Sequence, residues 1–211
     1  MRSIGFAILA GTLLAVPPAS PSDPPDSPSH FVGMLDAVSP GQVLEIRLRT
    51  GAGLHITAWD RDQISVESDW TEERCRDARI ELTRVSGGAL LASYYPDDHL
   101  EVNHNCSFSI QVRVPRRFDL RIRSAGGGVR ITGLNGRVSG RTGGGRIALE
   151  RLNGEVQLST GGGEIHVSDS DLDGRLSTGG GRIRFERVSG PVTARSGSVR
   201  GVVRGSVGRE T

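Results

Sequence analysis

Three aspartates at alternate positions form the sharpest chemical motif in this sequence. Asp169, Asp171 and Asp173 lie in the stretch DSDLDG, which ends in a glycine. Carboxylates spaced in this way before a glycine are typical of the start of a calcium-binding loop. Such a loop needs a glutamate at its twelfth position, and that position is Gly180 here. A solvated polar turn is therefore the simpler interpretation, and calcium is the only cofactor that the sequence leaves open.

A pair of glutamates offers a second kind of chemistry, the cleavage of a glycan. Glu150 and Glu186 would lie about 9.6 Å apart if each were two strand spacings from the other. Inverting glycosidases hold their two carboxylates about 6.5–9.5 Å apart, and Glu164 would lie nearby. Sugar clefts usually also need aromatic side chains and long loops, and Phe185 is the only aromatic residue in this part of the chain. We therefore predict a non-catalytic protein, with a glycan-cleaving β-helix enzyme as the alternative.

Two other chemical motifs are weaker. His166, Ser168 and Asp169 are close in sequence, but a nucleophilic triad needs a shielded site with an oxyanion hole, which a flat exposed strand lacks. The glycine triplets are followed by strand patterns and not by a helix, so they do not predict a phosphate-binding loop. The sequence thus predicts neither a hydrolytic triad nor a nucleotide site.

The beginning of the chain predicts export. Arg2 precedes the apolar run Ile4–Val16, which is shorter than the roughly 20 residues of a membrane span and suits a signal peptide. We expect a signal peptide over residues 1–19 and a Pro/Ser-rich linker over 20–29, with no later transmembrane segment. The protein would then reside in the periplasm, the cell envelope or outside the cell. In such an oxidising compartment, Cys75 and Cys106, the two cysteines of the chain, are expected to form a disulfide.

Charge is unevenly distributed along the chain. Residues 1–112 contain 8 arginines and 15 acidic residues, whereas residues 113–211 contain 18 arginines and 9 acidic residues. The second half could therefore attract an anionic surface, although an arginine-rich soluble surface gives the same pattern. We predict an anionic glycan or a cell-envelope protein as partner and no nucleic acid; the sequence does not predict an oligomeric state.

An 18-residue repeat must position all of these side chains. Thr142, Thr160 and Thr178 follow one another at this interval, and each is followed by three glycines. Between the glycine triplets, apolar residues alternate with polar ones, as in Ile147 and Leu149, which indicates short strands with one buried face. Strict spacing of the inward positions favours stacked coils in which equivalent strands pair in parallel.

We therefore predict an all-β fold, a β-solenoid of about 18-residue coils with two short strands per coil. Residues 125–211 form the regular glycine-rich repeats. Residues 30–124 show similar strand patterns with longer turns, and we expect them to form wider, irregular coils tied by the disulfide. One coil alone buries too few aliphatic side chains to offset the entropy of ordering its backbone, so the coils must stabilise each other.

Two stretches resemble a known family. The residues that carry the resemblance are RTGAGLHITAWDRDQISVE, and FSIQVRVPRRFDLRIRSAGGG with the repeats that follow, including the step Val114–Pro115. They look like the adhesin-like domain of unknown function family 4097, over roughly residues 40–205. The resemblance implies an exported bacterial envelope protein with a stacked β fold. It implies no reaction and no catalytic residue.

Overall fold

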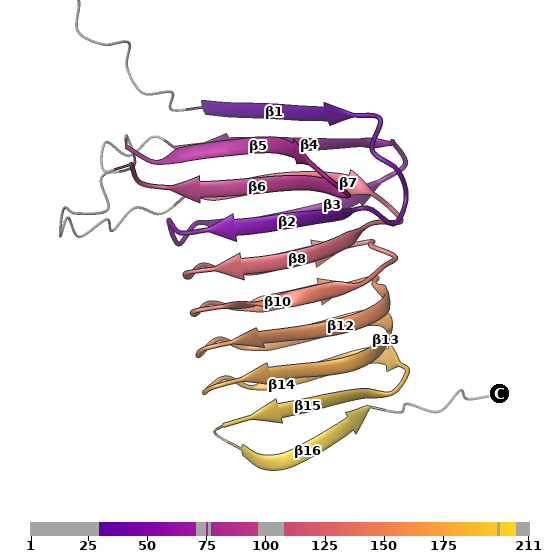
Figure 1. Ribbon diagram of the computed structural model, residues 1–211. Helices are drawn as coiled ribbons and strands as arrows, with labels where there is room; N and C mark the ends of the chain where they lie inside the picture. Colours follow the sequence, from indigo (N-terminus) through magenta and orange to yellow (C-terminus); the bar gives the residue numbers. More distant parts are fainter. Residues whose placement is uncertain (1–29, 71–74, 76, 97–107, 198, 206–211) are drawn as a thin grey trace, which may run out of the picture.

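The computed structural model describes residues 30–70, 75, 77–96, 108–197 and 199–205 (Figure 1). Sixteen strands within these ranges form one hydrogen-bonded sheet. The predicted signal peptide 1–19 and linker 20–29 lie outside the described residues. In the part of the chain that the structure describes, no helix has the length and apolar character needed to cross a membrane.

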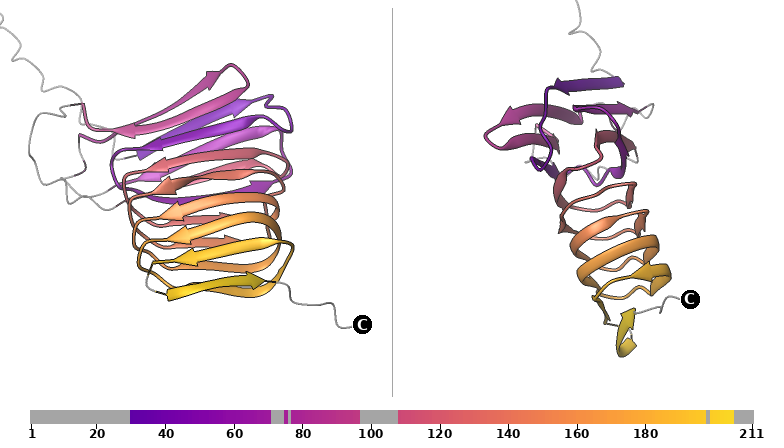
Figure 2. Two further views of the ribbon diagram at one scale, coloured as in Figure 1. Left: turned by 60° about the horizontal axis from the view of Figure 1, so that its bottom comes forward. Right: turned by 90° about the vertical axis from the view of Figure 1, so that its right-hand side faces the viewer.

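The sheet folds into two facing layers, which the right-hand view of Figure 2 shows from the side. The first layer contains β1 (His30–Asp36), β4 (Gln63–Asp69), β7 (Ser109–Pro115), β3 (Gly53–Trp59), β9 (Val129–Thr132), β11 (Ile147–Glu150) and β14 (Ile183–Ser189). The second layer contains β5 (Arg79–Val85), β6 (Gly88–Tyr94), β2 (Val43–Leu48), β8 (Asp119–Ser124), β10 (Val138–Thr142), β12 (Asn153–Thr160), β15 (Val192–Ser196) and β16 (Val199–Gly205). The 14-residue strand β13 (Ile165–Thr178) belongs to both layers and joins them.

The core lies between the two layers and is made mainly of Leu, Ile and Val. Alternation along each strand sends every second side chain inward. In β2, for example, Leu44, Ile46 and Leu48 are buried. In β13, Val167 and Leu172 are buried in the same way, while Asp169 and Asp171 between them face solvent. The polar faces of both layers are therefore the surfaces available for binding.

The predicted 18-residue register is confirmed for the glycine-rich part of the chain. Ile147 pairs with Ile165 and Ile165 pairs with Ile183, each time in parallel strands. In the other layer, Val138 pairs with Val156 in the same way. Equivalent inward side chains thus lie beside one another, which explains why the apolar positions repeat so strictly.

The predicted β-solenoid is nevertheless wrong as a description of the fold. The structure is a single mixed sheet that nearly closes on itself, and not a stack of separate coils with two short strands each. Strand β13 crosses from one layer to the other without interruption. The region 30–124, predicted as wider coils, instead contains the antiparallel pairs β1–β4, β4–β7 and β5–β6. Its strands also interleave, because β3 lies between β7 and β9, and β2 lies between β6 and β8.

Buried threonines explain the repeated Thr-Gly-Gly-Gly turns. The hydroxyl of Thr160 donates to the carbonyl oxygen of Gly145 over 3.0 Å, and Thr178 donates to Gly163 over 2.8 Å. Each hydroxyl is thereby satisfied inside the protein, as a buried polar group requires. Successive turns approach so closely that a Cβ on Gly161 would lie 2.1 Å from the carbonyl oxygen of Gly143. The threonine holds each turn to the preceding one, and glycine permits the contact.

Candidate functional site

Three neighbouring strands of the second layer carry arginines in one outward row. Arg47 of β2 pairs with Arg123 of β8, and Arg123 pairs with Arg141 of β10. Neighbouring strands are about 4.8 Å apart, and like charges directly opposite each other on a sheet are destabilising. Three adjacent arginines therefore oppose the stability of the sheet, which makes this row a candidate for binding.

The strand pattern fixes the outward direction of these side chains. Arg47 lies between the buried residues Ile46 and Leu48, and it is itself exposed. Arg123 stands in the same relation to Ile122 and Ser124. A slip of register by one residue would move the charges into the core, so the apolar alternation holds the arginines at the surface.

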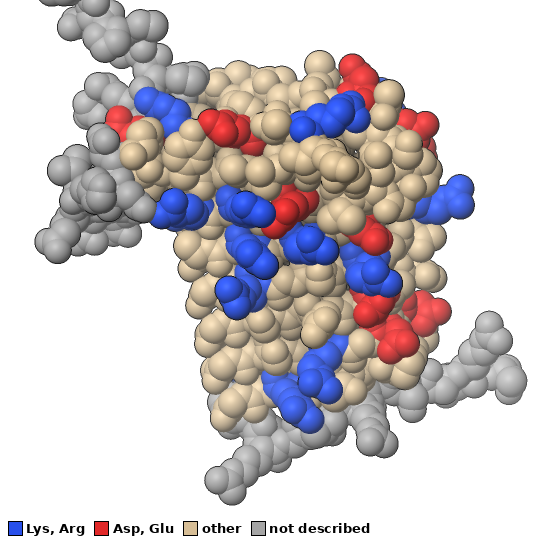
Figure 3. Space-filling view, viewed as in Figure 1, with Lys and Arg blue, Asp and Glu red and all other residues tan. Residues whose placement is uncertain are grey.

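The arginine row lines a hollow of about 310 Å³ at one end of these strands. We call it the arginine hollow; its lining residues are Arg47, Leu48, Arg49, Arg123, Ser124, Ala125 and Arg141. Figure 3 shows basic side chains gathered over the middle of this face, where β2, β8 and β10 lie. The lining contains no acidic residue, no histidine and no aromatic ring.

Glu45 is the acidic residue that acts most directly on the arginine hollow. Its carboxylate accepts a hydrogen bond from Arg47 Nε over 2.9 Å. This bond is the main cause that lowers the pKa of Glu45, and the charges of Arg47, Arg121 and Arg123 lower it further. Arg123 and Arg141 form no salt bridge with any acidic side chain in the described ranges. Within the described ranges, the charges of Arg123 and Arg141 are therefore not neutralised by an ion pair.

The structure does not bring the three predicted calcium ligands together. No group of three or more His, Cys, Asp or Glu residues within the described part of the chain is placed to hold a metal ion. Asp169 instead accepts two hydrogen bonds from Arg187, which lies one repeat later on β14. This contact lowers the pKa of Asp169. Asp171 and Asp173 are exposed further along β13. The calcium interpretation gains no support from this arrangement.

Asp169 has a structural role that explains its position. Its φ is 50°, in the left-handed region, where β13 passes from one layer to the other. Arg151 and Arg187, at the equivalent positions one repeat before and one repeat after, also have positive φ values of 54° and 51°. Aspartate tolerates this conformation better than most residues with a side chain. The first aspartate of DSDLDG thus occupies a corner of the sheet.

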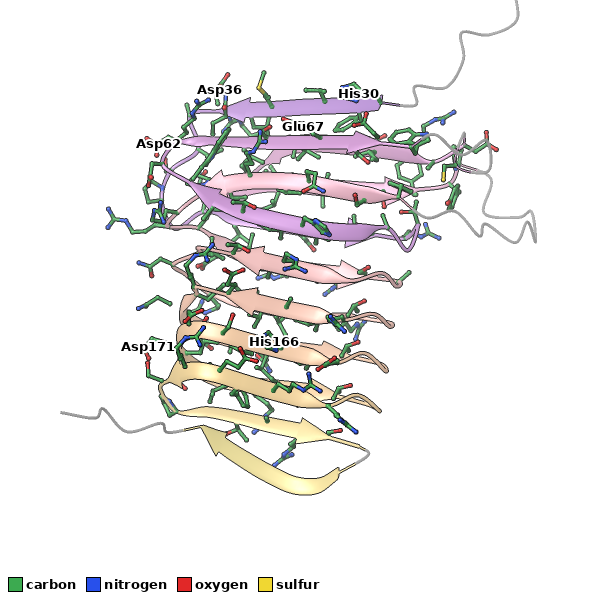
Figure 4. All side chains as sticks on the ribbon, turned by 180° about the vertical axis from the view of Figure 1, so that it is seen from behind. His30, Asp36, Asp62, Glu67, His166 and Asp171 are labelled. Atoms are coloured by element: carbon green, nitrogen blue, oxygen red, sulfur yellow. The ribbon has the colours of Figure 1, made fainter. Side chains whose placement is uncertain are left out.

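The glutamates of the alternative enzyme lie in the predicted row. Glu150 and Glu186 flank Ser168 on the outer face of the first layer. Glu150 is paired with Arg151, and Glu186 lies 3.8 Å from His166. Figure 4 shows this face with His166 labelled on its surface. The carboxylate of Glu150 is therefore held in a surface ion pair, and that of Glu186 has the ring of His166 beside it.

Two further sequence-based expectations concern this region and the cysteines. Glu164, which was expected near the other two glutamates, forms ion pairs with Arg146 and Arg184, each over 3.3 Å. Cys75 is fully buried, and no cysteine among the described residues is free. Cys106 lies outside the described residues, and the Cys75–Cys106 disulfide stays a prediction.

The arginine hollow was not found from the sequence, although part of its signal was present. Arg123 and Arg141 are eighteen positions apart and each immediately precedes the Ser or Thr of a glycine turn. The register confirmed above makes them neighbours. Arg47 joins them only because β2 pairs with β8, a contact between segments that no repeat connects.

Comparisons with known proteins show no family. No family model matches the chain, including that of the adhesin-like family it resembles, and no curated protein matches it. Among solved structures, a "putative cell adhesion protein" from Clostridium sporogenes has a TM-score of 0.30 and 7% identity, covering 79% of this chain and 98% of that one. A "putative adhesin" from Bacteroides fragilis has a TM-score of 0.30 and 12% identity, covering 81% and 97%. A "putative lipid binding protein" from Parabacteroides distasonis has a TM-score of 0.25 and 14% identity, covering 80% and 96%. Similarities this low transfer neither fold nor function.

Proposed function

We propose that this chain is an exported, non-catalytic, adhesin-like protein that binds an anionic glycan through the arginine hollow. The observation that carries the proposal is the row Arg47, Arg123 and Arg141 on three adjacent strands, in which Arg47 pairs with Glu45. Guanidinium groups remain protonated at every physiological pH and offer paired donors to carboxylate, sulfate or phosphate groups. A row of such groups matches a ligand with repeated acidic substituents better than a single small anion.

The chemistry of the lining supports binding without catalysis. The hollow contains arginines, two apolar residues and Ser124, and the hydroxyl of Ser124 already donates to the carbonyl oxygen of Gly126. General acid–base catalysis uses His, Glu, Asp, Lys, Tyr or Cys side chains, and the lining contains none of these residue types. A polymer bound here would be held but not protonated, deprotonated or attacked.

The lining of the arginine hollow has no aromatic ring, which argues against single-stranded nucleic acid and against a neutral sugar as its ligand. Proteins that bind single strands usually stack bases on aromatic side chains beside the positive groove. The arginine hollow has only guanidinium groups, the aliphatic Leu48 and small side chains around it. Recognition would therefore depend on the acidic groups of the polymer, and neutral glycans should not bind.

Retention on immobilised heparin, measured against salt concentration, tests this proposal. We expect retention at low ionic strength and release as salt screens the charges, with no retention on neutral dextran. The variant R123Q/R141Q should weaken binding about tenfold, because each exposed charge contact contributes up to about 1 kcal/mol. The matched control R130Q/R182Q removes two exposed arginines from elsewhere and should bind like the wild type. Equal losses in the two variants would show a general charge effect and refute the hollow as the site.

A further inference from the structure

The path of paired strands begins at β1 and ends at β5, while β14 and β16, off this path, also pair on one side only. Strand β1 has a ladder partner only in β4, and β5 only in β6. The two ends lie against each other at one end of the molecule, where Arg84 of β5 donates to the main-chain carbonyl of Asp36. They form no ladder with each other, so β1 presents a row of backbone groups with no strand partner in the described chain. Such an edge is a template for another strand.

Exposed apolar side chains are concentrated at this same edge. The large hydrophobic side chains that are exposed in the described ranges are Val32 at 53%, Met34 at 61% and Val85 at 41%, and all three lie on β1 or β5. No residue of β1 is buried, and its pairing with β4 is regular over seven residues without a bulge. Protected edges usually carry Lys, Pro or a bulge, and β1 has none of these.

The residues of β1 are complementary to themselves in an antiparallel arrangement. If two copies of HFVGMLD are aligned around Gly33, His30 of one copy faces Asp36 of the other at both ends. Val32 faces Met34 on the exposed side, and Phe31 faces Leu35 on the side toward the core. We propose that β1 pairs with β1 of a second copy of this chain, which gives a closed two-fold dimer with one continuous sheet.

The alternation of side chains along β1 agrees with this register. His30 faces Asp36 and Val32 faces Met34, all on the exposed side of the strand, while Phe31 and Leu35 face each other on the half-buried side. Gly33 lies on the two-fold axis, where it presents no side chain.

Sedimentation velocity on the purified, exported protein, from about 1 to 100 µM, tests the dimer. We expect the wild type to dimerise in this range. The variant V32K/M34K places lysine opposite lysine in the proposed register and should raise the dissociation constant at least tenfold. The variant V32K/M34E adds the same number of charged residues but places Lys opposite Glu, and it should remain dimeric. The control V85K makes a similar change on β5 and should dimerise like the wild type.

Three results would overturn the proposal. A wild type that remains monomeric over the whole range excludes the dimer. Loss of the dimer in V85K as large as in V32K/M34K shows that the interface is not β1. A monomeric V32K/M34E excludes the register around Gly33. Because Val32 and Met34 are exposed in the monomer, each variant is expected to retain the circular dichroism and melting temperature of the folded chain, which distinguishes dissociation from unfolding.

Discussion

Substitution of two glycines in a single turn tests how closely the turns pack. A Cβ on Gly163 would lie 1.7 Å from the carbonyl oxygen of Gly145 in the preceding turn. A Cβ on Gly162, the neighbouring residue, would have nothing within 4 Å. The variants G163A and G162A therefore have the same composition and differ only in whether the new methyl group meets the neighbouring turn.

The structure allows the cost of G163A to be worked out. A carbon and a carbonyl oxygen approach to about 3.3 Å at the closest, so the two turns must separate by roughly 1.5 Å. That movement breaks the hydrogen bond from Thr160 Oγ1 to the carbonyl oxygen of Gly145, which joins the two turns and is 3.0 Å long. This bond contributes about 1 kcal/mol, and displaced packing adds about 1–3 kcal/mol. We expect G163A to lose about 2–4 kcal/mol of unfolding free energy.

Thermal and urea unfolding of the two variants provide the assay. For a chain of this size, the loss in G163A corresponds to a melting temperature lower by roughly 5–15 °C. G162A should stay within about 0.5 kcal/mol of the wild type. Equal destabilisation of the two variants, or a larger effect in G162A, would refute the close approach of the turns.

Three further predictions follow from the geometry. R151G should stabilise the chain by about 0.5–1 kcal/mol in urea unfolding, because Arg151 has a φ of 54° at a corner where the equivalent Gly133 has 74°; a loss of stability would contradict the corner assignment. Because Glu45 has a lowered pKa, binding of a sulfated polymer should stay constant above pH 4.5 and strengthen as pH falls through that lowered pKa; E45Q should bind more tightly and show no such step. C75S/C106S should lose about 3 kcal/mol if the disulfide closes the loop between them, and recovery of free Cys75 from non-reducing peptide mapping would disprove the bond.

The repeat made the local register predictable. Inward residues one repeat apart, such as Ile147 and Ile165, are of the same type. Parallel pairing in register places them side by side, as the structure shows. The turn glycines were predictable for a related reason, since Gly163 stands where a side chain would collide with the preceding turn. Both features depend on contacts between segments that are similar in sequence and close along the chain.

The global architecture was not predictable from the same pattern. Strands of the region 30–124 pair with partners that no repeat connects, as when β3 enters between β7 and β9. Strand propensity and alternation say that such a segment is a strand, but they do not say which edge it joins. Extending the repeat to the whole chain therefore gave a solenoid where the structure has one mixed, nearly closed sheet.

The candidate site also combines contacts that the repeat predicts with contacts that it does not. Arg123 and Arg141 are one repeat apart and could have been placed together from the sequence. Arg47 enters the row only through the pairing of β2 with β8. Asp169, by contrast, was predicted as a calcium ligand, whereas in the structure it occupies a corner of the sheet with a φ of 50°. A backbone requirement and a metal site can select the same residue type.

A nuclear magnetic resonance titration of the isotope-labelled protein with a heparin oligosaccharide tests the central claim most directly. The account predicts amide shifts centred on Arg47–Arg49, Arg123–Ala125 and Arg141, the strand ends that line the arginine hollow. These shifts should disappear as salt rises, because exposed charges are screened. Shifts centred on the first layer, or no shifts at low ionic strength, would contradict it.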